Sequence, residues 1–198
     1  MGVEIENEKF CACAFMGKII IFGGVHRNKR RVKIFDPETK KVTKGKNMRK
    51  YAIRSACAVY RDRIVVSGGF QSARSCASYD PIANKWGKFP SMRRERYDHG
   101  SVAVGQRLYM VGGFLHDSLE FYDPDAGCFI AVVFTKRPEC LELLTCKVLS
   151  VGGKIFVFMN DSSELFCYDT LENEWEAFDG GCLTGNLRDF CCVKVAKT

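Results

Sequence analysis

The chain has few of the residues and motifs that build catalytic or cofactor sites. Its 198 residues include only three histidines, His26, His99 and His116, which lie far apart in the sequence. No G-x-x-x-x-G-K-[ST] or G-x-S-x-G motif is present, so the sequence gives neither a phosphate-binding loop nor a serine nucleophile elbow. No constellation of catalytic groups can be assembled, and we expect a protein that is not an enzyme, with no cofactor and no metal.

Cysteine is abundant, but its spacing does not indicate zinc or a disulfide framework. There are eleven cysteines, and no two of them are spaced C-x-x-C, the spacing typical of tetrahedral zinc sites. Many lie at equivalent places in apolar segments, where we expect Cys to act as a small apolar filler: Cys11, Cys13, Cys57, Cys146, Cys191 and Cys192. An odd count and an N-terminus without the features of a signal peptide favour a reducing compartment, so we expect a cytoplasmic location.

Long apolar runs and a strong basic excess are also missing. No apolar stretch approaches the roughly 18 residues that a membrane-spanning helix needs. The net charge of +7 is modest for a nucleic-acid-binding protein and favours acidic partners only weakly. The basic segments 26–31 and 40–50 lack the interleaved aromatic residues on which bases stack. We therefore expect neither nucleic acid nor a membrane as the partner.

A pattern of about 45 residues fills the chain four times. Each copy contains an apolar strand, a short polar loop and a strand that ends in an aromatic residue and Asp, and in three copies a glycine pair follows the first of these strands. The first three copies carry Gly23-Gly24, Gly68-Gly69 and Gly112-Gly113, and Met159-Asn160 stands in the fourth place. The steps between them are 45, 44 and 47 residues. Strand patterns repeated at this spacing, without a helical period, predict the blades of a β-propeller.

Each repeat is expected to form four strands. The innermost strands should be rich in Ala, Cys, Val and Gly, because small residues fit near a propeller axis, and five segments have this composition: 10–15, 55–60, 100–104, 146–151 and 190–195. The second strands are almost continuous apolar runs, as expected for strands buried on both faces: 18–22, 63–67, 107–111 and 154–158.

The third strands end in an aromatic residue and an aspartate. We expect the aspartate to accept hydrogen bonds from backbone N–H groups ahead of it and so to start a turn. The residues seven positions after each aromatic are Val42, Trp86, Phe129 and Trp175. We expect the two tryptophans to pack between adjacent blades, because their regular recurrence favours a core role over a ligand-stacking role.

The second and third repeats carry a family resemblance. Residues 79–86 are Tyr-Asp-Pro-Ile-Ala-Asn-Lys-Trp, and Met92, Arg96 and the segments 100–104 and 108–113 follow. In these motifs the chain resembles the kelch-repeat propellers of kelch-like ubiquitin-ligase substrate adaptors, and residues 9–196 take part in the match. The first repeat lacks the Trp, and the fourth lacks the glycine pair and the Pro.

The resemblance implies an all-β, kelch-type β-propeller with four blades of four antiparallel strands. It would form a single domain over residues 1–198, with repeats at 10–54, 55–99, 100–145 and 146–189 and a closing strand at 190–196. One innermost strand is then surplus. In this family the last innermost strand of the chain completes the first blade of the ring. Segment 10–15 would then be the innermost strand that follows an earlier blade. We therefore expect the C-terminal four blades of an incomplete six-bladed ring, and closure with four blades is the alternative.

The same resemblance implies a function in protein binding. Members of the family usually carry BTB and BACK domains before the propeller; the BTB domain binds a cullin, and the propeller binds the substrate for ubiquitination. A cullin would be reached only through such upstream domains, which this sequence does not show. Two alternatives remain: a kelch protein that binds actin or the cytoskeleton, and a stand-alone kelch fragment that competes with a full-length adaptor.

By resemblance, the recognition face is made of the loops between second and third strands and the loops that lead to the next blade. These loops are rich in Arg, whose planar fork matches carboxylates, so we expect an acidic peptide segment as the ligand. Neighbouring aromatic residues would supply apolar anchors. The alternative is that the charges are solvated and only keep the protein soluble. The expected partner-binding residues are Arg27, Arg30, Arg31, Arg49, Arg54, Phe70, Arg74, Arg93, Arg96, Tyr97 and Phe114.

Overall fold

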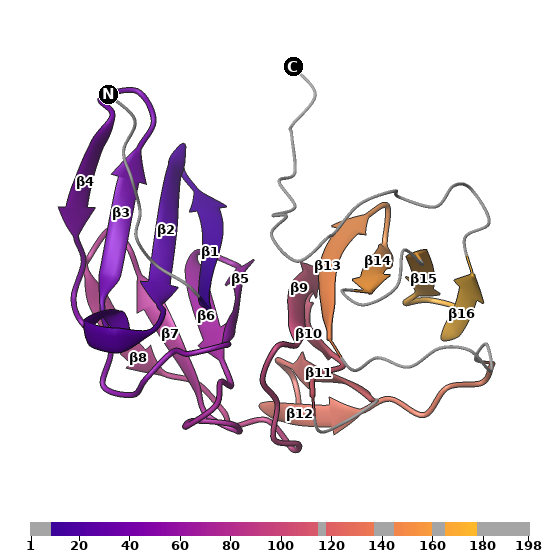
Figure 1. Ribbon diagram of the computed structural model, residues 1–198. Helices are drawn as coiled ribbons and strands as arrows, with labels where there is room; N and C mark the ends of the chain where they lie inside the picture. The colour runs from indigo at the N-terminus through magenta and orange to yellow at the C-terminus, as the bar shows by residue number, and fades with distance from the viewer. Residues whose placement is uncertain (1–8, 115–117, 137–144, 160–164, 178–198) are drawn as a thin grey trace. The chain divides into compact units, whose positions relative to one another are not determined.

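A computed structural model describes residues 9–114, 118–136, 145–159 and 165–177. In this part of the chain the regular structure consists of sixteen strands and one short 3-10 helix (Figure 1). The strands form four antiparallel sheets of four, each of which follows chain order from one edge to the other. The all-β prediction and the predicted four-stranded propeller blades are confirmed. No helix in the described segments is long and apolar enough to cross a membrane.

The chain divides into two compact units, residues 1–97 and 98–198, with two blades in each. Blade 1 contains β1 (Phe10–Phe15), β2 (Lys18–Gly23), the 3-10 helix η1 (His26–Asn28), β3 (Val32–Asp36) and β4 (Lys41–Lys44). Blade 2 contains β5 (Ala56–Tyr60), β6 (Arg63–Ser67), β7 (Cys76–Asp80) and β8 (Lys85–Lys88).

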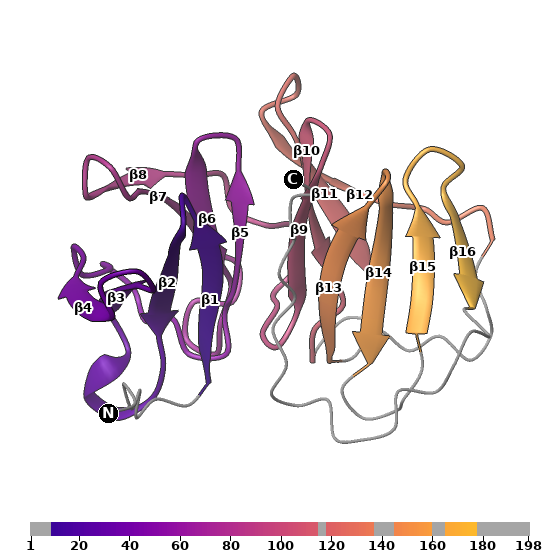
Figure 2. The ribbon, with the colours of Figure 1, turned by 90° about the horizontal axis from the view of Figure 1, so that it is seen from above.

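In the second unit, blade 3 contains β9 (Gly100–Val104), β10 (Arg107–Val111), β11 (Leu119–Asp123) and β12 (Cys128–Ala131). Blade 4 contains β13 (Cys146–Val151), β14 (Lys154–Met159), β15 (Leu165–Asp169) and β16 (Glu174–Ala177), which lie side by side in Figure 2. The predicted first and second strands agree with these bounds to within one residue. The predicted closing strand at 190–196 lies outside the described residues.

In the first unit, the core lies between the two blades. Tyr79 and Trp86 are directly opposite each other on β7 and β8, and both rings meet Phe22 of blade 1 edge to face, at centroid distances of 5.7 and 5.8 Å. The indole Nε1 of Trp86 also donates a hydrogen bond to the carbonyl of Lys46, which follows blade 1, at 2.7 Å. The prediction that Trp86 packs between adjacent blades is confirmed.

The second unit repeats this arrangement. Trp175 is only 2% exposed, stands opposite Tyr168, and packs against Phe134, which follows blade 3, at a centroid distance of 5.8 Å. Tyr109 of β10 belongs to the same buried cluster. The prediction for Trp175 is therefore confirmed as well, and in each unit one blade covers a face of the next.

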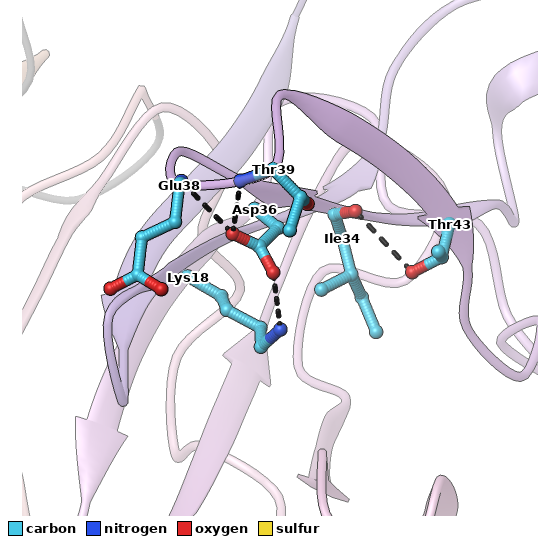
Figure 3. Close-up of polar contacts among 6 residues, drawn as sticks. All are labelled: Lys18, Ile34, Asp36, Glu38, Thr39 and Thr43. Atoms are coloured by element: carbon cyan, nitrogen blue, oxygen red, sulfur yellow. Dashed lines mark hydrogen bonds and ion pairs between the residues drawn. The ribbon is translucent and has the colours of Figure 1, made fainter.

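The turn after the third strand is built by its aspartate. In blade 1 the Oδ1 atom of Asp36 accepts the N–H groups of Glu38 and Thr39 at 3.0 and 3.2 Å, while Oδ2 accepts from the Nζ of Lys18 at 2.8 Å (Figure 3). The same pair of backbone hydrogen bonds recurs in the other blades, at Asp80, Asp123 and Asp169. The predicted role of these aspartates is confirmed in all four repeats.

The glycine pairs bring the loops close to neighbouring backbone. Gly69 has a φ of +107°, and a Cβ atom placed on it would lie 2.8 Å from the carbonyl oxygen of Ile53 and still closer to the hydroxyl of Ser55. Such an approach admits only glycine without local rearrangement. The loop after β6 can therefore lie against the segment that joins blade 1 to blade 2.

The Asp36 turn gives a prediction about pKa. The hydrogen bond from Lys18, together with those from the turn backbone, lowers the pKa of Asp36 from 3.8 to about 2. Because folding favours the ionised carboxylate, its stabilising effect is complete above pH 3.8 and is lost as the pH falls towards 2. We expect Lys18→Met to raise the pKa of Asp36 towards 3.8 in a carboxyl NMR titration. Lys40→Met, in the same turn, is the control, and an unchanged pKa in Lys18→Met would contradict the assignment.

Candidate protein-binding loops

Two kinds of loop meet at one end of each blade in the first unit. We call residues 24–31 and 68–75 the strand loops, and residues 45–55 and 89–97 the linker loops. In blade 1 the N–H groups of Met48 and Ala52 donate to the carbonyls of Arg30 and Lys29, both at 2.8 Å. In blade 2, residues 92 and 96 make the equivalent bonds to residues 74 and 73, at 3.0 and 2.9 Å. Backbone hydrogen bonds thus hold each strand loop beside its linker loop.

Arg30 and Arg74 stand at equivalent places in the two strand loops. The Nε of Arg30 donates to the carbonyl of Met48 at 2.6 Å, and the Nε of Arg74 donates to the carbonyl of Met92 at 3.0 Å. Each arginine therefore bonds its methionine twice, once by backbone and once by side chain. The sequence analysis predicted that both arginines bind a partner. In the structure, their Nε atoms instead form hydrogen bonds that hold the loops together.

Arg96 differs from the other predicted binding residues because it is buried. Its exposed fraction is 0%, and its carbonyl accepts the N–H of Gly69 at 2.9 Å. A buried guanidinium cannot contact a peptide on the surface of the protein. Arg96 is therefore not one of the exposed residues that could bind a partner. The sequence could not show this, since arginine is rarely fully buried.

Three predicted residues form a stack. The ring of Phe70 meets the ring of Tyr97 edge to face at 5.8 Å, and the guanidinium of Arg54 lies 5.0 Å from the centre of the Tyr97 ring. Phe70 is 60% exposed, and its N–H donates to the carbonyl of Ile53 at 2.9 Å. The stack therefore combines an exposed aromatic ring with a cation whose position is fixed by a second ring.

A second cation–aromatic pair was not predicted. The ammonium of Lys29 lies 5.6 Å from the ring centre of Tyr51, which is 43% exposed. Lys29 belongs to the strand loop and Tyr51 to the linker loop of blade 1. The sequence does show an aromatic residue directly after Arg49 and Lys50, which could have indicated a binding role for Tyr51. Its pairing with Lys29 depends on the fold.

The remaining predicted arginines of the first unit are exposed: Arg27, Arg31, Arg49 and Arg93. They belong to a strongly basic region. Residues 27–50 contain eleven Lys and Arg and two acidic residues, a net charge of +9 compared with +7 for the whole chain. The rest of the chain is therefore slightly acidic, and the positive charge is concentrated on blade 1 and its linker loop.

Phe114 belongs to the second unit and is 53% exposed after the glycine pair of blade 3. Much of the corresponding loops, residues 115–117 and 137–144, lies outside the described residues, so we group Phe114 apart from the first-unit set. Within the described segments, no group of three or more His, Cys, Asp or Glu side chains is placed to hold a metal ion.

No protein-family model and no curated protein matches this chain. The structure itself defines the class as an all-β protein built from β-propeller blades. Its first unit presents basic loops in which a cation and two aromatic rings are stacked.

The contacts of Arg30 and Arg74 predict that replacing either arginine lowers the stability of the fold. We expect Arg30→Met and Arg74→Met each to lower the free energy of unfolding by about 1 kcal/mol, because each loses a hydrogen bond to a loop carbonyl. Arg31→Met is the matched control in the same exposed loop and should change the free energy little. Urea denaturation measures all three. Equal stability of the Arg30, Arg74 and Arg31 variants would show that the Nε contacts do not hold the loops.

Proposed function

We propose that the loops of the first unit bind an acidic segment of a partner protein. The observation that carries this proposal is the stack of Phe70, Tyr97 and Arg54, in which an exposed ring and a guanidinium both contact the ring of Tyr97. An arginine can bind a carboxylate by donating two parallel hydrogen bonds to it. The Phe70 ring offers an apolar anchor next to that charge, which is a common composition of interface hot spots.

The surrounding charge supports the same ligand. The exposed side chains of Arg27, Arg31 and Arg49 lie in the loops of blade 1, where most of the positive charge of the chain is concentrated. A basic surface of this kind accelerates the approach of an acidic partner and disfavours basic ones. Tyr51 beside Lys29 adds a second exposed ring to these loops.

We further propose that the chain is the substrate-recognition propeller of a kelch-like adaptor for a cullin-type ubiquitin ligase. Two observations support this: the four-stranded blade recurs four times, and the motifs in residues 79–113 resemble that family. In such adaptors the cullin is bound by other domains. The task of this chain would be to hold the substrate and not to catalyse a reaction.

A binding experiment tests the acidic ligand. The probe is a fluorescent peptide rich in Glu with a single Leu, titrated with the full chain at low and at physiological salt. We expect Phe70→Ala and Arg54→Ala each to weaken binding about tenfold. The triple variant Arg27→Glu, Arg31→Glu and Arg49→Glu should remove binding.

The matched control places the same change of charge elsewhere in blade 1. It carries Lys40→Glu, Lys41→Glu and Lys44→Glu, in the turn before β4 and on β4 itself. This control should bind more tightly than the loop triple variant. An equal loss of peptide affinity in the two triple variants, together with an unchanged affinity in Phe70→Ala, would contradict a binding site in the loops. The peptide would then be held only by nonspecific attraction between charges.

The adaptor role has its own test. Proteins that are captured from cells by the wild-type chain, but not by Phe70→Ala, should become longer-lived when cullin-type ligases are inhibited. If the lifetimes of these proteins do not change, the adaptor role is wrong even where peptide binding holds.

A further inference from the structure

Three cysteines lie in the cluster where blade 1 meets blade 2. Cys11 and Cys13 lie on β1 and Cys57 lies on β5, and both β1 thiols are close enough to Cys57 to raise its pKa. All three are free cysteines. Cys11 is part of the apolar cluster between the two blades, and Cys13 and Cys57 pack against it.

The strand geometry explains this meeting. Cys11 and Cys13 are two residues apart, so their side chains leave the same face of β1. Cys57 pairs with Val66 in the register of β5 and β6, and Val66 belongs to the same interblade cluster. The innermost strands of two successive blades therefore bring their thiols to one place. A covalent bond there would join the blades.

Cys146 shows how differently a cysteine of an innermost strand can be used. It lies on β13 of blade 4, and its Sγ donates to the carbonyl of Val111 at 3.4 Å. This thiol is thus paired with backbone of the preceding blade. The prediction that cysteine fills the innermost strands is confirmed for the described examples, but at Cys57 the neighbours are two further sulfur atoms.

We propose that Cys57 is a site of reversible oxidation, at which a peroxide joins its sulfur to that of Cys11 or Cys13 in a disulfide between blades 1 and 2. The sulfur of the β1 cysteine attacks one peroxide oxygen, the O–O bond breaks, and a sulfenic acid and water form. The Cys57 sulfur then displaces the hydroxyl group. The S–S bond forms, the S–O bond breaks, and the Cys57 proton leaves with the hydroxyl as a second water.

Two thiols are oxidised in this sequence, and the peroxide is reduced to water. The third thiol stays reduced beside the new bond, so it can exchange with the disulfide and move the cross-link between Cys11 and Cys13. Contact with the two neighbouring thiols and burial raise the pKa of Cys57 well above its ordinary value. The reaction should therefore be slow compared with that of a low-pKa redox cysteine.

Peptide mapping tests the proposal directly. The folded full chain is treated with hydrogen peroxide, its remaining thiols are alkylated, and it is digested with trypsin without reduction. Trypsin places Cys11 and Cys13 together in residues 10–18 and Cys57 alone in residues 55–61. We expect a linked pair of these two peptides that a reductant separates again. Its mass should be the sum of the two unmodified peptides, less two hydrogens and plus one alkyl group on the β1 thiol that stayed reduced.

Cysteine variants test whether Cys57 is the thiol common to both possible disulfides. Cys57→Ser and Cys57→Ala should lose the linked pair, whereas Cys11→Ser and Cys13→Ser should each keep it through the remaining β1 thiol. Cys76→Ser, a buried cysteine of blade 2, is the control and should keep it too. A disulfide confined to residues 10–18, or a Cys57 peptide that stays fully reduced in the wild-type chain, would overturn the proposal. The wild-type map decides even if a variant fails to fold.

Discussion

The structure depends on the burial of one blade face against the next. A four-stranded sheet cannot cover its own two faces, so each blade needs a neighbour to exclude water. In the first unit Phe22 of blade 1 supplies this cover for Tyr79 and Trp86 of blade 2. In the second unit Phe134 and Trp175 are packed in the same way. This packing is the fixed frame on which the loops of each unit are held.

The frame also divides the arginines of the loops into two kinds. Some serve the fold: Arg30 and Arg74 hold loop carbonyls, and Arg96 is enclosed. Arg30 and Arg74 nevertheless stay exposed, as do Arg27 and Arg49. The burial of Arg96 and the Nε contacts of Arg30 and Arg74 leave fewer arginine groups for a ligand than the sequence suggests. The proposed ligand site rests on that smaller set and on the aromatic stack beside it.

The sequence predicted the features that are local or periodic. Strand positions follow from repeated apolar runs, and the turn at Asp36 follows from a side chain bonding backbone two and three residues ahead. Apart from the packing of the two tryptophans between blades, contacts between distant segments could not be predicted. Arg30 reaches a carbonyl 18 residues away, and Cys57 meets Cys11 only because two blades pack together. The kelch relationship, the adaptor role and the cytoplasmic location stay predictions.

The most direct test of this account asks whether blade packing holds the loops. Phe22→Ala removes a fully buried ring from the interface and should cost about 3–5 kcal/mol if the chain stays folded. Amide hydrogen exchange would then be measured at Met48 and Met92, whose N–H groups join the loops of blades 1 and 2. The account predicts faster exchange at both amides. Unchanged protection at both, beside a loosened strand β2, would contradict it.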